Sequence, residues 1–181
     1  MIWTPRLATS NDTPEMEQLI PLSVRSLQAT HYSPMQLESA LGPVFGVDRQ
    51  LIHDRSYFVV EQQGEILGCG GWSKRRSLFG VDAARSEPDP ELNPAVDPAR
   101  IRAFFVHPAW ARRGIRSSIL AACEEAIQKA HFRVTELVAT LTGEPFYAAH
   151  GYIVAERYEV NITSNVRLPV VRTAKVLSPP D

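Results

Sequence analysis

The chain has 181 residues, of which 44% are hydrophobic and 22% charged, and its formal net charge is −1. This is the composition of an ordinary globular protein, and a chain of this length buries enough surface for a core without metal or disulfide support. The near-zero charge excludes a global basic field that would attract nucleic acid or an anionic membrane, so any anion binding has to be local. We expect a single domain over residues 1–181.

The sequence contains no membrane or secretion signal. No apolar run approaches the ~20 residues that span a bilayer, and residues 1–6 lack the pattern of a signal peptide. Cys69 and Cys123 have no close partner at metal-ligand spacing. We therefore expect a cytoplasmic protein with two buried, reduced thiols and no bound metal.

Helix signals dominate the first quarter of the chain. Residues 2–8 alternate weakly, as a strand does, and residues 10–15 carry capping residues and an early proline that mark a helix start. Pro21 should kink or divide this helix, because proline lacks the backbone donor. A second helix is predicted from Pro34 to Leu41, with its end at the Gly-Pro pair that follows.

A hairpin and a long loop come next. Residues 56–61 and 66–72 are apolar runs joined by a short turn with glycine, which predicts a β-hairpin. Residues 74–99 interleave acidic side chains with prolines, and proline disfavours both helix and central strand. We expect an insertion loop over 74–99. It is either a solvated loop without a chemical role or a lid over a site.

The stretch 101–131 combines an apolar strand, a basic turn and an amphipathic helix. The turn contains Arg112, Arg113 and Gly114, and the following apolar residues recur every three or four positions. A strand that enters a helix through such a turn aims unpaired N–H groups and the positive end of the helix dipole at one small volume. The pattern indicates an anion site, most often for phosphate.

The last third of the chain predicts more strands. Residues 136–140 form a strand parallel to 101–106, because a crossover helix joins the two. A short helix over 146–150 precedes a closing antiparallel pair at 152–160 and 168–177.

Two motifs resemble those of the GNAT superfamily of N-acyltransferases. Residues 106–115, Val-His-Pro-Ala-Trp-Ala-Arg-Arg-Gly-Ile, are similar to its acyl-CoA-binding motif, and residues 146–152, Phe-Tyr-Ala-Ala-His-Gly-Tyr, to its second motif. The order of elements matches along nearly the whole chain. The resemblance implies a mixed α/β fold with a mostly antiparallel twisted sheet, one parallel pair, and helices on both faces.

The resemblance also implies how an acyl-CoA is held. Backbone amides from Arg112 to Ser117 would bind the pyrophosphate, and the strand end would bond the pantetheine amides. Tyr147 would protonate the departing thiolate, a role that suits a phenol with a reference pKa of about 10. The implied cosubstrate-binding residues are Phe105, Val106, Arg112, Arg113, Gly114, Ile115, Arg116 and Ser117.

Two positions depart from the family pattern. Ala111 stands where the family usually has glutamine or arginine, but Arg112 and Arg113 supply charge nearby. Arg116 stands where a small residue lets the backbone approach the phosphates. Its side chain either turns outward and contacts phosphate, which we favour, or crowds the site.

No residue stands out as a general base. The carboxylates compatible with the topology are Glu61, Glu65 and Glu144. His107 and His150 are interpreted as structural. Tyr32 lies in the region that the family uses to wall the acceptor site and is a candidate substrate contact.

These observations predict an acetyl-CoA-dependent N-acetyltransferase acting on a primary amine of a small molecule or peptide. The alternative is a non-catalytic acyl-CoA-binding sensor or inactive relative, because of Arg116 and the missing base. Basic residues occur at 74–76 and 112–116, but the net charge and the lack of an aromatic–basic repeat argue against nucleic acid. Exposed edge strands and the resemblance suggest a homodimer.

Overall fold

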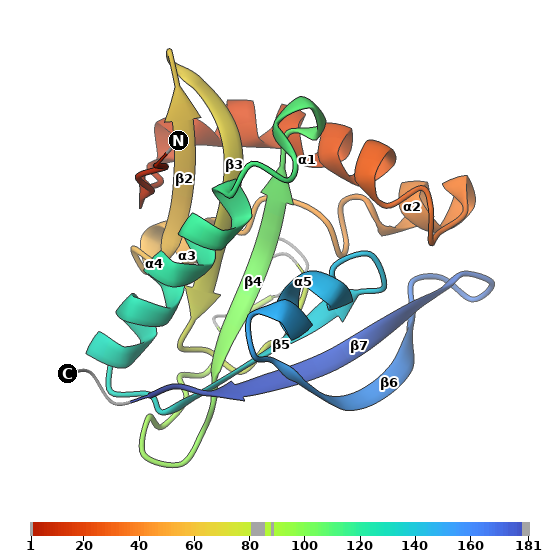
Figure 1. The fold of residues 1–181 in the computed structure, drawn as a ribbon. Helices are drawn as coiled ribbons and strands as arrows, with labels where there is room; N and C mark the ends of the chain where they lie inside the picture. The colour runs from red at the N-terminus through yellow and green to blue at the C-terminus, as the bar shows by residue number, and fades with distance from the viewer. Residues whose placement is uncertain (1, 81–85, 88, 179–181) are drawn as a thin grey trace.

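The computed structural model describes residues 2–80, 86–87 and 89–178. They form a seven-stranded sheet in the order β1-β2-β3-β4-β5-β7-β6, in which only β4 and β5 run parallel (Figure 1). The strands are β1 Arg6–Leu7, β2 Tyr57–Gln62, β3 Glu65–Ser73, β4 Ala99–Val106, β5 Val134–Thr140, β6 Ile153–Asn161 and β7 Arg167–Val176. The α-helices are α1 Thr13–Leu27, α2 Pro34–Ala40, α3 Arg49–His53, α4 Ile115–Lys129 and α5 Glu144–Ala149.

Helices cover both faces of the sheet. One apolar layer joins the sheet to α1, α2 and α3 through residues such as Ile20, Leu37 and Leu51, and the other joins it to α4 and α5 through Ile119 and Tyr147. Figure 1 shows α4 in front of β2 and β3, with α1 behind them. The mixed α/β class, the single parallel pair and the two helical layers are as the sequence predicts.

Helix α1 continues through Pro21, so this proline does not divide the helix. The buried side chains Met16, Ile20 and Val24 form one stripe along it, and their burial favours a continuous helix. Proline removes the bond to the carbonyl four residues earlier, at Glu17. Glu17 is exposed, so water can bond that carbonyl instead.

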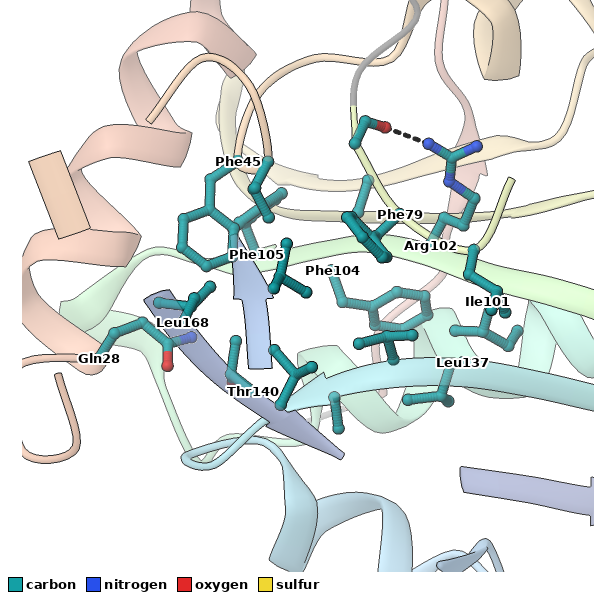
Figure 2. A pocket seen from close by; sticks show the side chains of 18 of the residues that line it. Gln28, Phe45, Phe79, Ile101, Arg102, Phe104, Phe105, Leu137, Thr140 and Leu168 are labelled. Carbon is teal, nitrogen blue, oxygen red and sulfur yellow. Dashed lines mark hydrogen bonds between the residues drawn. The ribbon is translucent and has the colours of Figure 1, made fainter. Parts of the chain in front are cut away.

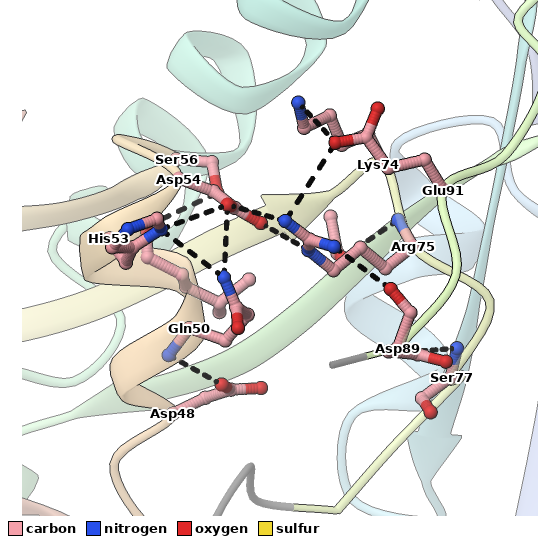
Figure 3. Close-up of polar contacts among 12 residues, drawn as sticks. Asp48, Gln50, His53, Asp54, Ser56, Lys74, Arg75, Ser77, Asp89 and Glu91 are labelled. Carbon is pink, nitrogen blue, oxygen red and sulfur yellow. Dashed lines mark hydrogen bonds and ion pairs between the residues drawn. The ribbon is translucent and has the colours of Figure 1, made fainter. Parts of the chain in front are cut away.

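Helix α3, which no sequence pattern predicts, anchors the insertion loop. The Asp48 side chain accepts from the Gln50 amide at 3.1 Å and begins the helix. Just after the helix, Asp54 pairs with the Arg75 guanidinium at 2.7 Å, and Arg75 also donates to the Asp89 carbonyl at 2.9 Å (Figure 3). The first part of the predicted 74–99 loop is therefore fixed to the end of α3. Residues 81–85 and 88 of this loop lie outside the described part of the chain.

The described residues contain no helix that is both long and apolar enough to cross a membrane. Cys69 on β3 and Cys123 on α4 are buried free thiols, as the sequence predicts. Burial raises the pKa of Cys69 to about 12, so this thiol stays protonated.

Candidate active site

Strands β4 and β5 pair briefly and then part. Ala99 pairs with Thr135 and Arg100 with Glu136, and no later residue of β4 pairs with β5. The Arg100–Glu136 ion pair and a 3.3 Å contact from Arg172 to Glu136 hold this closed end. Beyond it, β4 presents a strand edge without a neighbouring strand, which leaves backbone groups for another partner.

An outer cavity of about 620 Å³ lies at this parting. The end of α1, the second half of β4, the loop before α4, the first turn of α4 and the start of α5 surround it. The lining residues used below are Ser23, Gln28, Phe104, Phe105, Val106, Arg112, Gly114, Ile115, Arg116, Ser117 and Phe146.

A smaller inner cavity of about 90 Å³ adjoins the outer one. Figure 2 shows Phe45, Phe104 and Leu137 around it. Tyr147, Arg102 and residues 78–80 of the insertion loop also line it. The described residues that line both cavities are Gln28, Phe104, Phe105 and Arg116. Among the described lining residues of either cavity there is no carboxylate.

The loop before α4 has the strand–turn–helix form on which the predicted anion site depends. Gly114 begins the helix at φ +86°, a left-handed conformation that glycine adopts without strain. The Trp3 indole N–H donates to the Arg113 carbonyl at 2.7 Å and fixes the loop. The amides of residues 115–117 have no helical acceptor and lie at the positive end of the helix dipole. Because these residues line the outer cavity, an anion bound there meets several donors.

The backbone of Val106 already has a partner. Its N–H donates to the Ser23 hydroxyl of α1 at 3.2 Å. A peptide-like ligand along this edge has to displace Ser23 from the Val106 N–H or bond the Val106 carbonyl instead. Phe105, the other predicted pantetheine contact, lines both cavities.

Tyr147 on α5 is buried, with 4% of its surface exposed. Its ring makes edge contacts with Phe104, Phe146 and Tyr152, with centroids 6.3, 5.1 and 5.5 Å away. Burial raises the pKa of the Tyr147 phenol, and the Arg116 charge partly opposes that rise. The phenol is therefore protonated at neutral pH.

Arg116 turns toward the rings of α5. Its guanidinium carbon lies 4.5 Å from the Phe146 ring centroid and 4.9 Å from that of Tyr147. Nε is buried without a hydrogen-bond partner in the described part of the chain. The side chain thus lies between the two cavities.

Tyr32 lies outside both cavities. Its hydroxyl donates to the Pro169 carbonyl at 2.6 Å and accepts from the Leu141 amide at 2.9 Å. These bonds give Tyr32 a structural role, joining the segment after α1 to the ends of β5 and β7.

The three candidate carboxylates also lie elsewhere. Glu61 pairs with Arg6, Glu144 pairs with Arg157, and Glu65 is exposed where β3 begins. The two histidines have local roles: His107 Nδ1 accepts from the Ala109 amide at 3.2 Å, and His150 Nδ1 lies 2.8 Å from the Phe146 carbonyl oxygen.

Sequence reasoning missed Gln28, the residue after α1. Its Oε1 is buried without a hydrogen-bond partner among the described residues, and the side chain lines both cavities (Figure 2). An unpaired carbonyl oxygen at this point can accept a bond from an amine. No motif marks this position, which the sequence identifies only as the end of a helix.

Comparison with known proteins identifies similar sequences and folds. The model of the GNAT acetyltransferase domain matches residues 53–154. A GCN5-related N-acetyltransferase from Rhodopseudomonas palustris superposes with a TM-score of 0.71 at 18% identity, covering 98% of this chain and 99% of that one. No curated protein sequence matches the chain.

Two further similar structures were solved with a ligand. The PaiA N-acetyltransferase from Thermoplasma acidophilum, in complex with coenzyme A, has a TM-score of 0.66 at 13% identity over 98% of this chain and 100% of that one. A GNAT family acetyltransferase from Brucella melitensis, in complex with acetyl-CoA, has a TM-score of 0.58 at 15% identity over 98% and 90%. At these identities the likeness shows the fold, and the family match spans more than half of the sequence. The chain belongs to the GNAT family of acetyltransferases.

Proposed function

We propose that this protein transfers an acetyl group from acetyl-CoA to a primary amine. The observation that carries the proposal is the parting of β4 and β5, which joins a helix start with unpaired amides to a cavity lined by a buried tyrosine. A thioester with a diphosphate at its far end fits that combination. GNAT family membership and two similar structures with coenzyme A or acetyl-CoA support it.

The outer cavity is the proposed cosubstrate site. The amides of residues 115–117 would hold the diphosphate, with Arg112 and Arg113 adding positive charge. The free edge of β4 would hold the amide-bearing pantetheine as an added strand, with Ser23 giving up its bond to Val106. The thioester would then lie where the two cavities meet.

The chemistry uses groups that line the two cavities. The amine nitrogen attacks the thioester carbonyl carbon, the carbon–sulfur bond breaks, and Tyr147 Oη gives its proton to the sulfur. Gln28 Oε1 would accept a bond from the amine and direct its lone pair. The proton released by the attacking amine goes to water, because no described carboxylate lines the cavities.

The missing carboxylate also supports the second candidate, a non-catalytic acyl-CoA sensor. Such a protein would bind acetyl-CoA in the outer cavity without turnover. The two candidates differ in whether coenzyme A is released when an amine is added.

Two measurements test the proposal. Calorimetry measures acetyl-CoA binding, and a thiol reagent measures coenzyme A released with a panel of small amines, amino acids and peptide N-termini. Cys69 and Cys123 are buried, which keeps the background low. We expect binding and amine-dependent release. Binding without release for every amine class would favour the sensor.

The Tyr147→Phe variant tests the assigned acid. We expect kcat to fall more than tenfold, because the thiolate then leaves unprotonated, while affinity for acetyl-CoA changes less than about twofold. An unaltered kcat would remove Tyr147 from the mechanism.

A further inference from the structure

The Arg116 side chain packs beside Gly143 and the rings of Phe146 and Tyr147. Its Nη2 is so close to the backbone before α5 that a Cβ on Gly143 would lie 3.0 Å away. No carboxylate among the described residues pairs with it. Its neighbours are the faces of Phe146 and Tyr147, which attract a cation through their π electrons.

The other groups around Tyr147 leave Arg116 as its main electrostatic partner. From α4, Tyr147 also meets the buried neutral thiol of Cys123, and from β4 it meets the Phe104 ring. Tyr152 packs on its other side, and the Tyr152 hydroxyl donates to Glu124 at 3.0 Å.

The charge of the Glu124 carboxylate is itself balanced by a lysine. Lys175 lies 2.9 Å from both oxygens of Glu124. Among the described side chains in ring contact with Tyr147, Arg116 is therefore the charged one.

We propose that Arg116 is a positioning residue that stabilises the phenolate of Tyr147 while this tyrosine protonates the leaving thiolate; this rests on the proposed function. When the proton moves from Tyr147 Oη to sulfur, the negative charge moves from the thiolate to the phenolate. A buried phenolate is unfavourable, so the transfer is uphill without a compensating cation. The Arg116 guanidinium, which packs on the Tyr147 ring, supplies that cation.

This role explains why a long charged side chain stands where a small residue was expected. In the structure the guanidinium lies on the rings of α5, so the side chain turns from the helix start toward the tyrosine. The phosphate contact that the sequence favoured and the site-crowding alternative remain distinct outcomes of the test.

The test compares three arginine variants. Arg116→Met removes the charge and keeps the length, and Arg116→Lys keeps the charge. Arg157→Met is the matched control, because Arg157 pairs with Glu144 at the start of α5, the helix that carries Tyr147, but lies outside both cavities.

With Arg116→Met we expect kcat to fall about tenfold with little change in KM for acetyl-CoA. The high-pH decline of kcat should move upward by about one pH unit or more, because the phenol loses its stabilising cation. Arg116→Lys should recover most of kcat, and Arg157→Met should behave as the wild type.

A second readout does not require turnover. In protein carrying 3-fluorotyrosine, whose phenols titrate at lower pH, the ¹⁹F resonance missing from Tyr147→Phe identifies Tyr147. Its titration midpoint should rise by about one unit in Arg116→Met. If the wild type released no thiol with any amine, the proposed function would fail, and this midpoint would still decide whether Arg116 sets the ionisation of Tyr147.

Three results would overturn the inference. An unchanged kcat and midpoint in Arg116→Met would remove the coupling. Weaker or tighter acetyl-CoA binding at constant kcat would assign the side chain to the diphosphate or to crowding. Loss confined to acceptors that carry a carboxylate would make Arg116 a substrate anchor.

Discussion

Neighbouring glycines of β3 face opposite sides of the sheet and offer a way to separate the site from the core. A Cβ on Gly70 would lie 2.7 Å from the ring of Phe104, which lines both cavities. A Cβ on Gly71 would lie 2.7 Å from the carbonyl oxygen of Ser56 and 3.1 Å from Leu51. Since ordinary contact begins at 3.4 Å, each alanine must displace its neighbour by the difference, about 0.7 Å.

The Phe104 ring and the Ser56 carbonyl respond differently to the added methyl groups. For Gly70→Ala, the Phe104 ring can move into the cavities and toward Tyr147. A displacement of this size beside the reacting atoms lowers kcat/KM by about 10- to 100-fold, and the free energy of unfolding falls by less than about 1 kcal/mol. For Gly71→Ala, the Ser56 oxygen is held by the Trp72 amide at 3.0 Å. Because a hydrogen-bonded backbone atom must shift, the free energy of unfolding falls by about 1–3 kcal/mol.

Urea denaturation followed by tryptophan fluorescence gives the stability of each variant, and thiol release gives kcat/KM. We expect Gly70→Ala to lose activity with a small change in midpoint, and Gly71→Ala to lose stability with a small change in kcat/KM. If both variants lost stability equally and Gly70→Ala kept its kcat/KM, then Phe104 would not be the group that yields, and its proposed place beside the thioester would be wrong.

Two further variants test Gln28 and Asp12. Gln28→Met should lower kcat/KM for the amine about tenfold, because one hydrogen bond to the amine is lost. The free energy of unfolding should not fall, because the buried Gln28 oxygen has no partner to lose among the described residues. Kinetics and urea denaturation measure the two quantities, and a loss of stability would contradict a role at the site. Arg6 donates to Asp12 at 2.8 and 2.9 Å and lowers the pKa of that carboxyl from 3.8 to about 2. A depressed folded-state pKa stabilises the fold above about pH 4, and this contribution is lost as the pH falls toward 2. Asp12→Asn should reduce the slope of unfolding free energy against pH below about pH 4, measured by urea denaturation at each pH. An unchanged slope would show that other carboxyls set the pH dependence of stability.

The elements that the sequence predicts well are those whose signal is local. The hairpin of β2 and β3 follows from two apolar runs and a turn, and α4 follows from one apolar face. Helix α3 has five residues, too few for a periodic pattern. Pro21 does not divide α1, because the packing of the helix on the sheet, which the local rule omits, outweighs the lost bond.

The residues of the candidate site also differ in whether a local sequence signal identifies them. The loop at residues 112–117 and Tyr147 can be named from motifs, because short spacing determines their local structure. Gln28, the Ser23 bond to Val106 and the direction of Arg116 cannot, since each depends on how α1, β4 and α5 come together in space. The sequence therefore predicts a place for the anion better than a place for the chemistry.

An irregularity in β4 brings the two halves of this site together. Arg102 pairs with Asp48 at 2.8 Å on the α3 side, and Ala103, at φ +57°, packs on the same side. Two successive residues thus face one layer, and the register against β3 shifts at this point. Such a bulge reverses the alternation of every later residue. Phe104 therefore faces α4 and Tyr147, where a regular strand would bury it against α1 and leave the tyrosine without its partner.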